Sequence, residues 1–147
     1  MQNGRLADPH FRSFHRLFYR CQKEDIEGQR LLGPRIKSFD VSVNWSKYGT
    51  PWDVIFGFPN LGIAQILVRQ IRVDLPTDRS TRQREPIKPH EYNAVHMPEH
   101  DNYAHSEIAV FKDGQRVTRT RDVGERAKKE FRQLISDKSF IVLQPKG

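Results

Sequence analysis

The sequence has a single cysteine, Cys21, and no long apolar segment. One cysteine cannot form a disulfide within the chain, which is typical of proteins from a reducing compartment. The longest apolar stretch, residues 63–73, is interrupted by polar side chains and is far shorter than the roughly 20 apolar residues that span a bilayer. The first residues also lack the apolar core of a secretory signal. We therefore expect a cytoplasmic protein.

The short motifs that identify common enzymes are absent as well. The chain has no phosphate-binding glycine loop, no dinucleotide fingerprint, no zinc-ligand cysteine set and no nucleophile elbow. Its 147 residues, of which 36% are hydrophobic and 10% aromatic, are enough for one modest core. We expect a single domain over residues 1–147, with a function that has to be inferred from charge and local patterns.

The N-terminal region predicts a basic amphipathic helix over residues 9–27. Asp8 can cap it, Pro9 suits the first helical position and Gly28 can end it. Helical spacing places five apolar residues on one face: Phe11, Phe14, Leu17, Phe18 and Cys21. The opposite face carries a basic stripe of Arg12, Arg16, Arg20 and Lys23. Such a stripe is either a solvated face or a contact surface for phosphates or an acidic partner.

Residues 39–45 alternate apolar and polar side chains, which predicts a half-buried strand. Asp40, Ser42 and Asn44 would share its polar face.

The remaining segments complete an α+β fold class: a small antiparallel sheet with the N- and C-terminal helices packed on one face. Asp113-Gly114 is the favoured pair for a tight hairpin turn. The predicted elements are a short capped helix from residue 50, a helix ending in a strand over 61–73, a long polar loop over 74–103, a hairpin over 106–120, a helix over 122–136 and a strand over 140–143.

Charge is unevenly distributed along this basic chain, whose formal net charge is +7. Lys and Arg dominate residues 69–88 and 112–132, whereas residues 91–107 contain neither and include several carboxylates and histidines. Cationic side chains that neutralise phosphates supply most sequence-independent affinity for nucleic acid. We expect a nucleic-acid-interacting protein, with RNA preferred, in which Arg79, Arg82 and Arg84 join the basic stripe. The alternative is a non-catalytic interaction subunit that docks an acidic partner protein in a larger complex.

The acidic, histidine-containing segment allows three interpretations. Histidines can act as general acid and base in metal-independent RNA cleavage, because imidazole titrates near neutral pH. A divalent metal can instead be held at His96, His100 and His105, although Pro98 prevents the helical geometry of paired histidine ligands. The third interpretation gives these histidines no chemistry. The sequence leaves all three open.

His105 is the strongest single candidate because it begins a predicted strand, and a strand holds a functional group more rigidly than a loop does. Alternation places Glu107 on the same face. If this strand pairs with the 39–45 strand, Ser42 and Asn44 join them in one polar patch. We therefore predict a catalytic group of His105, Glu107, Asn44 and Ser42, which a distance beyond about 10 Å between His105 and Asn44 would exclude.

Several short motifs resemble a group of small uncharacterised bacterial proteins. They are Phe39 with Ser42-Val43-Asn44, the Gly62–Arg72 stretch, Ala104-His105, the Phe131–Ile135 helix and the Phe140–Pro145 strand. The resemblance covers residues 35–147 and implies no known activity. It favours His105, Asn44 and Ser42 as site residues.

Overall fold

The computed structural model describes residues 6–36, 40–71, 91–112, 115–119 and 125–146. Most of these residues belong to one antiparallel sheet. Its strands are β1 (Arg16–Cys21), β4 (Val41–Trp45), β5 (Gly62–Leu67), β6 (Glu91–His96), β7 (His105–Lys112), β8 (Gln115–Arg116) and β9 (Phe140–Leu143). The strand order is β6-β7-β4-β1-β5-β9, and β8 pairs with β7.

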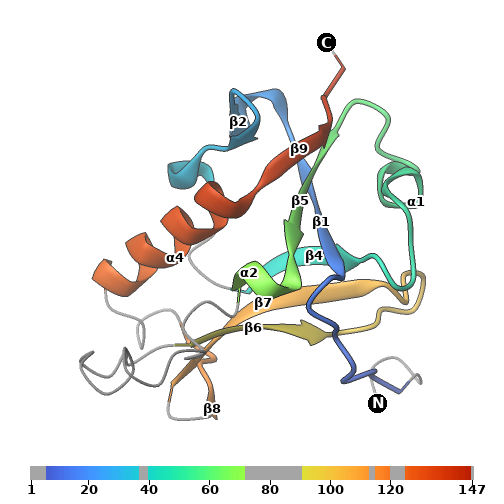
Figure 1. Cartoon of the computed structure of the whole chain (residues 1–147). Helices are drawn as coiled ribbons and strands as arrows, with labels where there is room; N and C mark the ends of the chain where they lie inside the picture. The colour runs from blue at the N-terminus through green and yellow to red at the C-terminus, as the bar shows by residue number, and fades with distance from the viewer. Residues whose placement is uncertain (1–5, 37–39, 72–90, 113–114, 120–124, 147) are drawn as a thin grey trace.

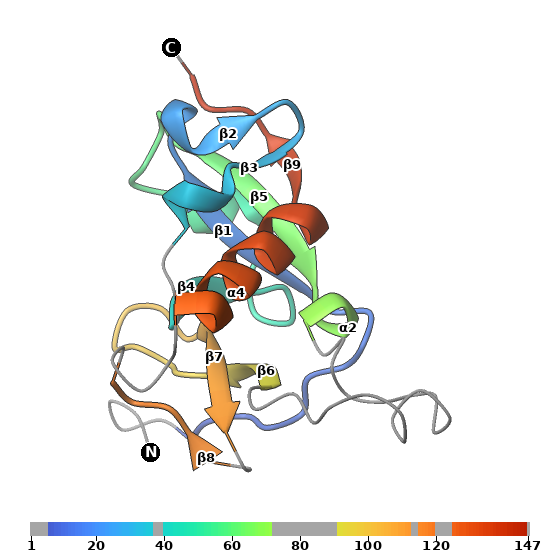
Figure 2. The same cartoon turned by 90° about the vertical axis from the view of Figure 1, so that its left-hand side faces the viewer.

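Short helices and a small hairpin surround the sheet. The α-helices of the described residues are α1 (Pro51–Ile55), α2 (Val68–Ile71) and α4 (Glu125–Lys138). The two-stranded hairpin β2 (Ile26–Glu27) and β3 (Arg30–Leu31) is flanked by the 3-10 turns η1 (Lys23–Asp25) and η2 (Gly33–Arg35). Figure 1 shows α4 and α1 on opposite sides of the sheet, and Figure 2 shows α4 crossing the strands with β3 beside it.

The predicted fold class is wrong in two respects: the proportion of helix to strand, and the structure of the N-terminal region. Strands dominate the described residues, and α4 is the only long helix among them. Residues 9–27 do not form a helix: an irregular segment leads into β1, and η1 follows. The sheet therefore carries one long helix on one face instead of two.

The position of β1 explains why the N-terminal prediction fails. This strand lies inside the sheet, with β4 on one side and β5 on the other. Leu17 and Phe18 are neighbours in sequence and both are almost completely buried, facing opposite sides of the sheet. A strand covered on both faces has consecutive apolar residues, and over a short stretch these cannot be distinguished from one face of a helix.

The two faces of the sheet bury separate apolar clusters. On the face covered by α4, which we call the inner face, Phe131 and Ile135 are fully buried in one cluster with Trp45. On the opposite face, which we call the outer face, Val54 of α1 and Ile63 pack with Phe18. The smaller cluster covers only part of the outer face. Polar side chains of β4 and β7 occupy another part of it.

Other local predictions divide into confirmed and wrong ones. The 39–45 strand, the cap of α1, the pairing of β7 with β8 and the C-terminal strand are confirmed. Residues 61–73 reverse the predicted order, because strand β5 comes first and the short helix α2 follows. Residues 91–96 of the predicted loop form β6, which pairs with β7 along its length. Residues 74–90 of that loop lie outside the described residues.

Candidate functional site

The predicted pairing between the two candidate strands is confirmed. β4 lies beside β7 in antiparallel register, with Asn44 opposite His105 and Ser42 opposite Glu107. Alternation along both strands places these four side chains on the outer face. The prediction that they come together is correct, whereas their catalytic role stays a prediction.

His105 is held in one orientation by its neighbours. Its Nδ1 lies 2.7 Å from the backbone oxygen of Met97, so this nitrogen donates its hydrogen to the carbonyl. In the neutral ring Nε2 is then an acceptor, and the Ser42 hydroxyl can donate to it across 3.4 Å. Both side chains line a cavity of about 220 Å³ with Asn44 and Arg20. The imidazole can therefore accept a proton on the cavity side.

Glu107 is engaged in an ion pair and does not line this cavity. Its carboxylate and that of Asp40 both accept from Nη2 of Arg116, the Asp40 contact being 2.9 Å long. Burial alone would lower the pKa of Arg116, but the hydrogen bonds that it donates to the two carboxylates outweigh burial and raise the pKa above its usual value. Glu107 thus positions Arg116 at the edge of the site, and the structure gives it no place as a proton donor in the cavity.

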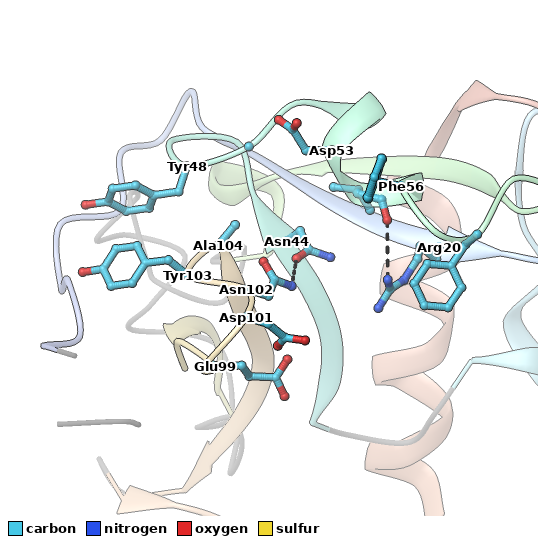
Figure 3. A pocket seen from close by; sticks show the side chains of 13 residues that line it. Arg20, Asn44, Tyr48, Asp53, Phe56, Glu99, Asp101, Asn102, Tyr103 and Ala104 are labelled. Atoms are coloured by element: carbon cyan, nitrogen blue, oxygen red, sulfur yellow. Dashed lines mark hydrogen bonds between the residues drawn. The ribbon is translucent and has the colours of Figure 1, made fainter. Parts of the chain in front are cut away.

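A larger cavity of about 510 Å³ adjoins this group, since Arg20 and Asn44 line both cavities (Figure 3). None of its other lining residues was among the predicted site residues. They are Tyr48, Gly49, Asp53, Val54, Phe56 and Phe58 from the β4–β5 connection, and Glu99, Asp101, Asn102, Tyr103 and Ala104 from the β6–β7 connection. The one sequence feature that indicates this cavity is the lack of Lys and Arg over residues 91–107. We interpreted that feature as a sign of functional histidines, whereas the residues of this segment that line the cavity include carboxylates.

Local sequence fixes one wall of this larger cavity. The Thr50 hydroxyl accepts from the backbone N–H of Asp53 at 3.3 Å, and the Asp53 carboxylate accepts from the Thr50 N–H at 2.8 Å. This reciprocal cap, with Pro51 at the first helical position, starts α1. Hydrogen bonds from Thr50 also lower the pKa of Asp53. The side chain of Asp53 is therefore an anion at neutral pH.

The predicted phosphate-binding stripe does not exist. Arg12 lies in the irregular N-terminal segment, Arg16 and Arg20 lie in β1, and Lys23 lies in η1. Of these four residues, Arg20 alone lines the cavities. The stripe was wrong because it assumed helical spacing. The predicted loop contacts Arg79, Arg82 and Arg84 lie outside the described residues.

The three histidines proposed as metal ligands do not converge. His96 is 3% exposed and lies on the inner face, where its Nδ1 accepts from the Asp8 N–H at 2.8 Å and its Nε2 donates to the Tyr103 carbonyl at 2.6 Å. His100 is exposed, and His105 lies on the outer face. Among the described residues, no three side chains of ligand type cluster closely enough to hold a metal ion. Both ring nitrogens of His96 are also occupied, which removes it as a partner for His105 in acid-base chemistry.

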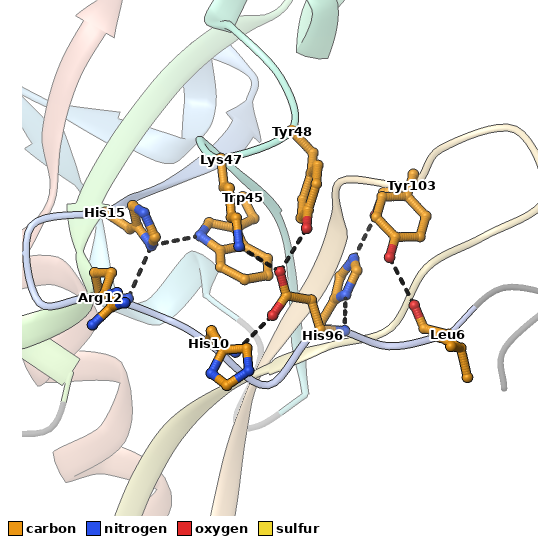
Figure 4. A network of polar contacts seen from close by, with 10 residues as sticks. Leu6, His10, Arg12, His15, Trp45, Lys47, Tyr48, His96 and Tyr103 are labelled. Carbon is orange, nitrogen blue, oxygen red and sulfur yellow. Dashed lines mark hydrogen bonds and ion pairs between the residues drawn. The ribbon is translucent and has the colours of Figure 1, made fainter.

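The N-terminal segment is fastened by a second network of polar contacts, shown in Figure 4. The Asp8 carboxylate accepts from Nζ of Lys47 at 2.6 Å and from the Tyr48 hydroxyl. The hydrogen bond from Lys47, followed by that from Tyr48, holds the pKa of Asp8 far below its usual value. His15 accepts at Nδ1 from the Trp45 indole at 3.0 Å, and burial with nearby Lys47 lowers its pKa. These contacts require a charged Asp8 and a neutral His15.

Comparison of the chain with known proteins finds no relative. The chain matches no protein-family model, and no curated protein or solved structure is similar to it. The resemblance to small bacterial proteins therefore stays a prediction. In the ranges that the structure describes, no helix has both the length and the apolar composition needed to cross a membrane.

Proposed function

We propose that this is a cytoplasmic RNA-binding protein that holds single-stranded RNA at the outer face of its sheet. The observation that carries the proposal is a group of exposed aromatic side chains beside a cavity that contains an arginine. Their exposed fractions are 87% for Phe56, 69% for Trp52, 44% for Phe58 and 40% for Tyr48. All but Trp52 line the larger cavity.

This arrangement suits unpaired bases. Each base that stacks on an aromatic side chain contributes about 1–3 kcal/mol, and any base can do so because each has a π face. The Arg20 guanidinium lies 4.2 Å from the centre of the Phe58 ring. Its one polar contact within the described part of the chain is a long hydrogen bond of 3.4 Å to the Val54 carbonyl. Arg20 can therefore contact a nucleotide without first losing a carboxylate partner.

Two further properties support the proposal. The formal charge of +7 favours association with a polyanion through counterion release. The lone Cys21 is buried, and burial together with nearby Asp25 raises its pKa to about 11, so the thiol is protonated and unreactive at neutral pH. A buried thiol without a disulfide partner fits the cytoplasm.

The binding test uses a labelled single-stranded RNA of mixed sequence and fluorescence anisotropy over a range of salt concentrations. The logarithm of the association constant should fall linearly with the logarithm of the salt concentration. Phe56→Ala should weaken binding about 5- to 150-fold, the equivalent of one lost stacking contact. Phe14→Ala is the matched control, because Phe14 is also a largely exposed phenylalanine and does not line either cavity.

Three results would contradict the proposal. Absence of RNA binding at low salt, or an affinity that does not change with salt, removes it. Binding to an acidic protein surface under the same conditions would instead support the alternative, a non-catalytic interaction subunit. Equal losses in Phe56→Ala and Phe14→Ala would show that the RNA does not lie at the cavity.

RNA cleavage at His105 is a second candidate, favoured by the hydrogen bond that directs its Nε2 toward Ser42 and the smaller cavity. A neutral imidazole in this position can take the proton of a 2′-hydroxyl. The protein should then cleave RNA in the presence of a chelator, and His105→Ala should abolish the cleavage. Cleavage lost on chelation would favour a metal-dependent reaction. RNA that stays intact with the unmodified protein would remove this candidate without affecting the binding proposal.

A further inference from the structure

The larger cavity carries groups of opposite hydrogen-bonding character on its two sides. Arg20 lies on one side, with its guanidinium over the Phe58 ring. Figure 3 shows the carboxylates of Glu99 and Asp101 pointing into the cavity from the other side. Neither carboxylate has a cationic partner within ion-pair distance in the described part of the chain. A ligand that spans the cavity must present acceptors toward Arg20 and donors toward the carboxylates.

Asn44 contributes a largely buried side chain to this cavity, with an amide nitrogen that can donate to a ligand. The side chain is only 5% exposed, and its Oδ1 accepts from Nδ2 of Asn102 at 2.6 Å. This bond leaves the Asn44 amide nitrogen turned into the cavity (Figure 3), and no acceptor among the described residues bonds to it. This nitrogen is not sealed from solvent, because among the described residues Nε of Arg132 is the one side-chain nitrogen or oxygen that is buried without a partner. A ligand oxygen in the cavity can therefore accept from the Asn44 amide in place of water.

Among the RNA bases, guanine matches this set of groups. It presents two adjacent acceptors, O6 and N7, which arginine commonly binds as a pair. It also presents adjacent donors, the N1–H and the N2 amino group, which carboxylates can accept. Adenine and cytosine each place an acceptor next to their amino group, and uracil has a single N–H between two carbonyls. These three bases would leave an acceptor facing a carboxylate, which is unfavourable.

We propose that this cavity binds a guanine base, with its acceptors toward Arg20 and Asn44 and its donor edge toward Glu99 and Asp101. The inference rests on the proposed RNA binding and names the nucleotide that the site selects. The volume of about 510 Å³ lies within the range of small-ligand sites and is ample for one base. The phosphates would stay outside, because the lining includes Glu99, Asp101 and Asp53 against the single cation Arg20.

The test compares oligouridines of about nine nucleotides that carry one central guanine, adenine, cytosine, uracil or hypoxanthine. The guanine oligomer should bind about 5- to 150-fold more tightly than the all-uridine one, the usual discrimination of a paired base contact. Hypoxanthine lacks only the N2 amino group and should lose part of that preference. Asp101→Asn and Glu99→Gln should abolish the preference, so that each variant binds the guanine and all-uridine oligomers equally tightly. Glu24→Gln is the control, since Glu24 is exposed and lies outside the cavity.

Each outcome decides between the two proposals. Equal affinity for all five oligomers would overturn the guanine site and leave RNA binding intact. A guanine preference that survives in both cavity variants would place the selective site elsewhere. No binding of any oligomer at low salt would overturn RNA binding and the guanine site together. Glu99 and Asp101 are exposed, so both variants should fold, and the hypoxanthine comparison needs no variant.

Discussion

Replacing Ser139 by alanine should destabilise the protein strongly, although the change removes only one oxygen atom. The Ser139 hydroxyl accepts from the Leu31 N–H at 2.9 Å and donates to the Ser136 carbonyl at 2.9 Å. The Ser136 hydroxyl in turn donates to the Leu31 carbonyl at 2.6 Å. All three residues are buried. The serines therefore fasten β3 to the end of α4, across more than a hundred residues of sequence.

The size of the effect follows from what the substitution leaves behind. The Ser136 carbonyl keeps a long contact of 3.4 Å from the Ser139 N–H, so one modest hydrogen bond is lost there, worth about 0.5–1.5 kcal/mol. The Leu31 N–H stays buried without an acceptor, which costs about 1–3 kcal/mol more. The free energy of unfolding should fall by about 2–4 kcal/mol. For a chain of this length that corresponds to a melting temperature lower by roughly 5–15 °C.

The assay is urea unfolding followed by the fluorescence of the tryptophans, one of which, Trp45, is fully buried. The midpoint should fall while the slope with urea stays unchanged, because the native surface is the same. Ser13→Ala, at an exposed serine in the N-terminal segment, should be neutral. A loss below about 0.5 kcal/mol for Ser139→Ala, at an unchanged slope, would refute the assigned hydrogen bonds.

Three further predictions use the same unfolding assay. Phe131→Ala should lower the free energy of unfolding by about 3–5 kcal/mol, since this ring is fully buried under the sheet. A decrease below about 1 kcal/mol would contradict the place of Phe131 in the core. Gly62→Ala should destabilise by about 1–3 kcal/mol, because its new Cβ would lie 2.5 Å from the Leu143 carbonyl oxygen, whereas Gly49→Ala, with ordinary contacts, should be close to neutral. The lowered pKa of His15 means that the unfolded chain binds its proton more readily than the native one. The contribution of His15 to the free energy of unfolding is fully present above the pKa of the unfolded chain, near 6.5. It decreases as the pH falls below that value, and it stops changing once the pH is below the pKa of the folded protein. His15→Gln should make the free energy of unfolding less dependent on pH between pH 7.5 and pH 5. An unchanged dependence would contradict the inference that the folded protein holds His15 in its uncharged form.

The site was partly predictable for a simple geometric reason. Side chains alternate along strands, so two correctly identified strands place Ser42 with Asn44, and His105 with Glu107, on common faces. Their pairing then brought the four residues together, as the structure shows. The cavity itself was not predictable, because Arg20, Asn44 and Asp101 come from separate segments that the sheet and its connections bring together. Glu107 was assigned to chemistry because the sequence does not show Arg116 beside it.

Local signals by themselves determined β4, the cap of α1, the buried face of α4 and β9, because neighbouring residues alone carry those patterns. Tertiary structure decided β1, β5 and β6. A strand obtains its backbone hydrogen bonds from distant segments, and a strand buried on both faces loses the alternation that would identify it. The same dependence applies to charge. The sequence shows a basic chain with an acidic interval, but only the fold turns two carboxylates of that interval toward an arginine of β1.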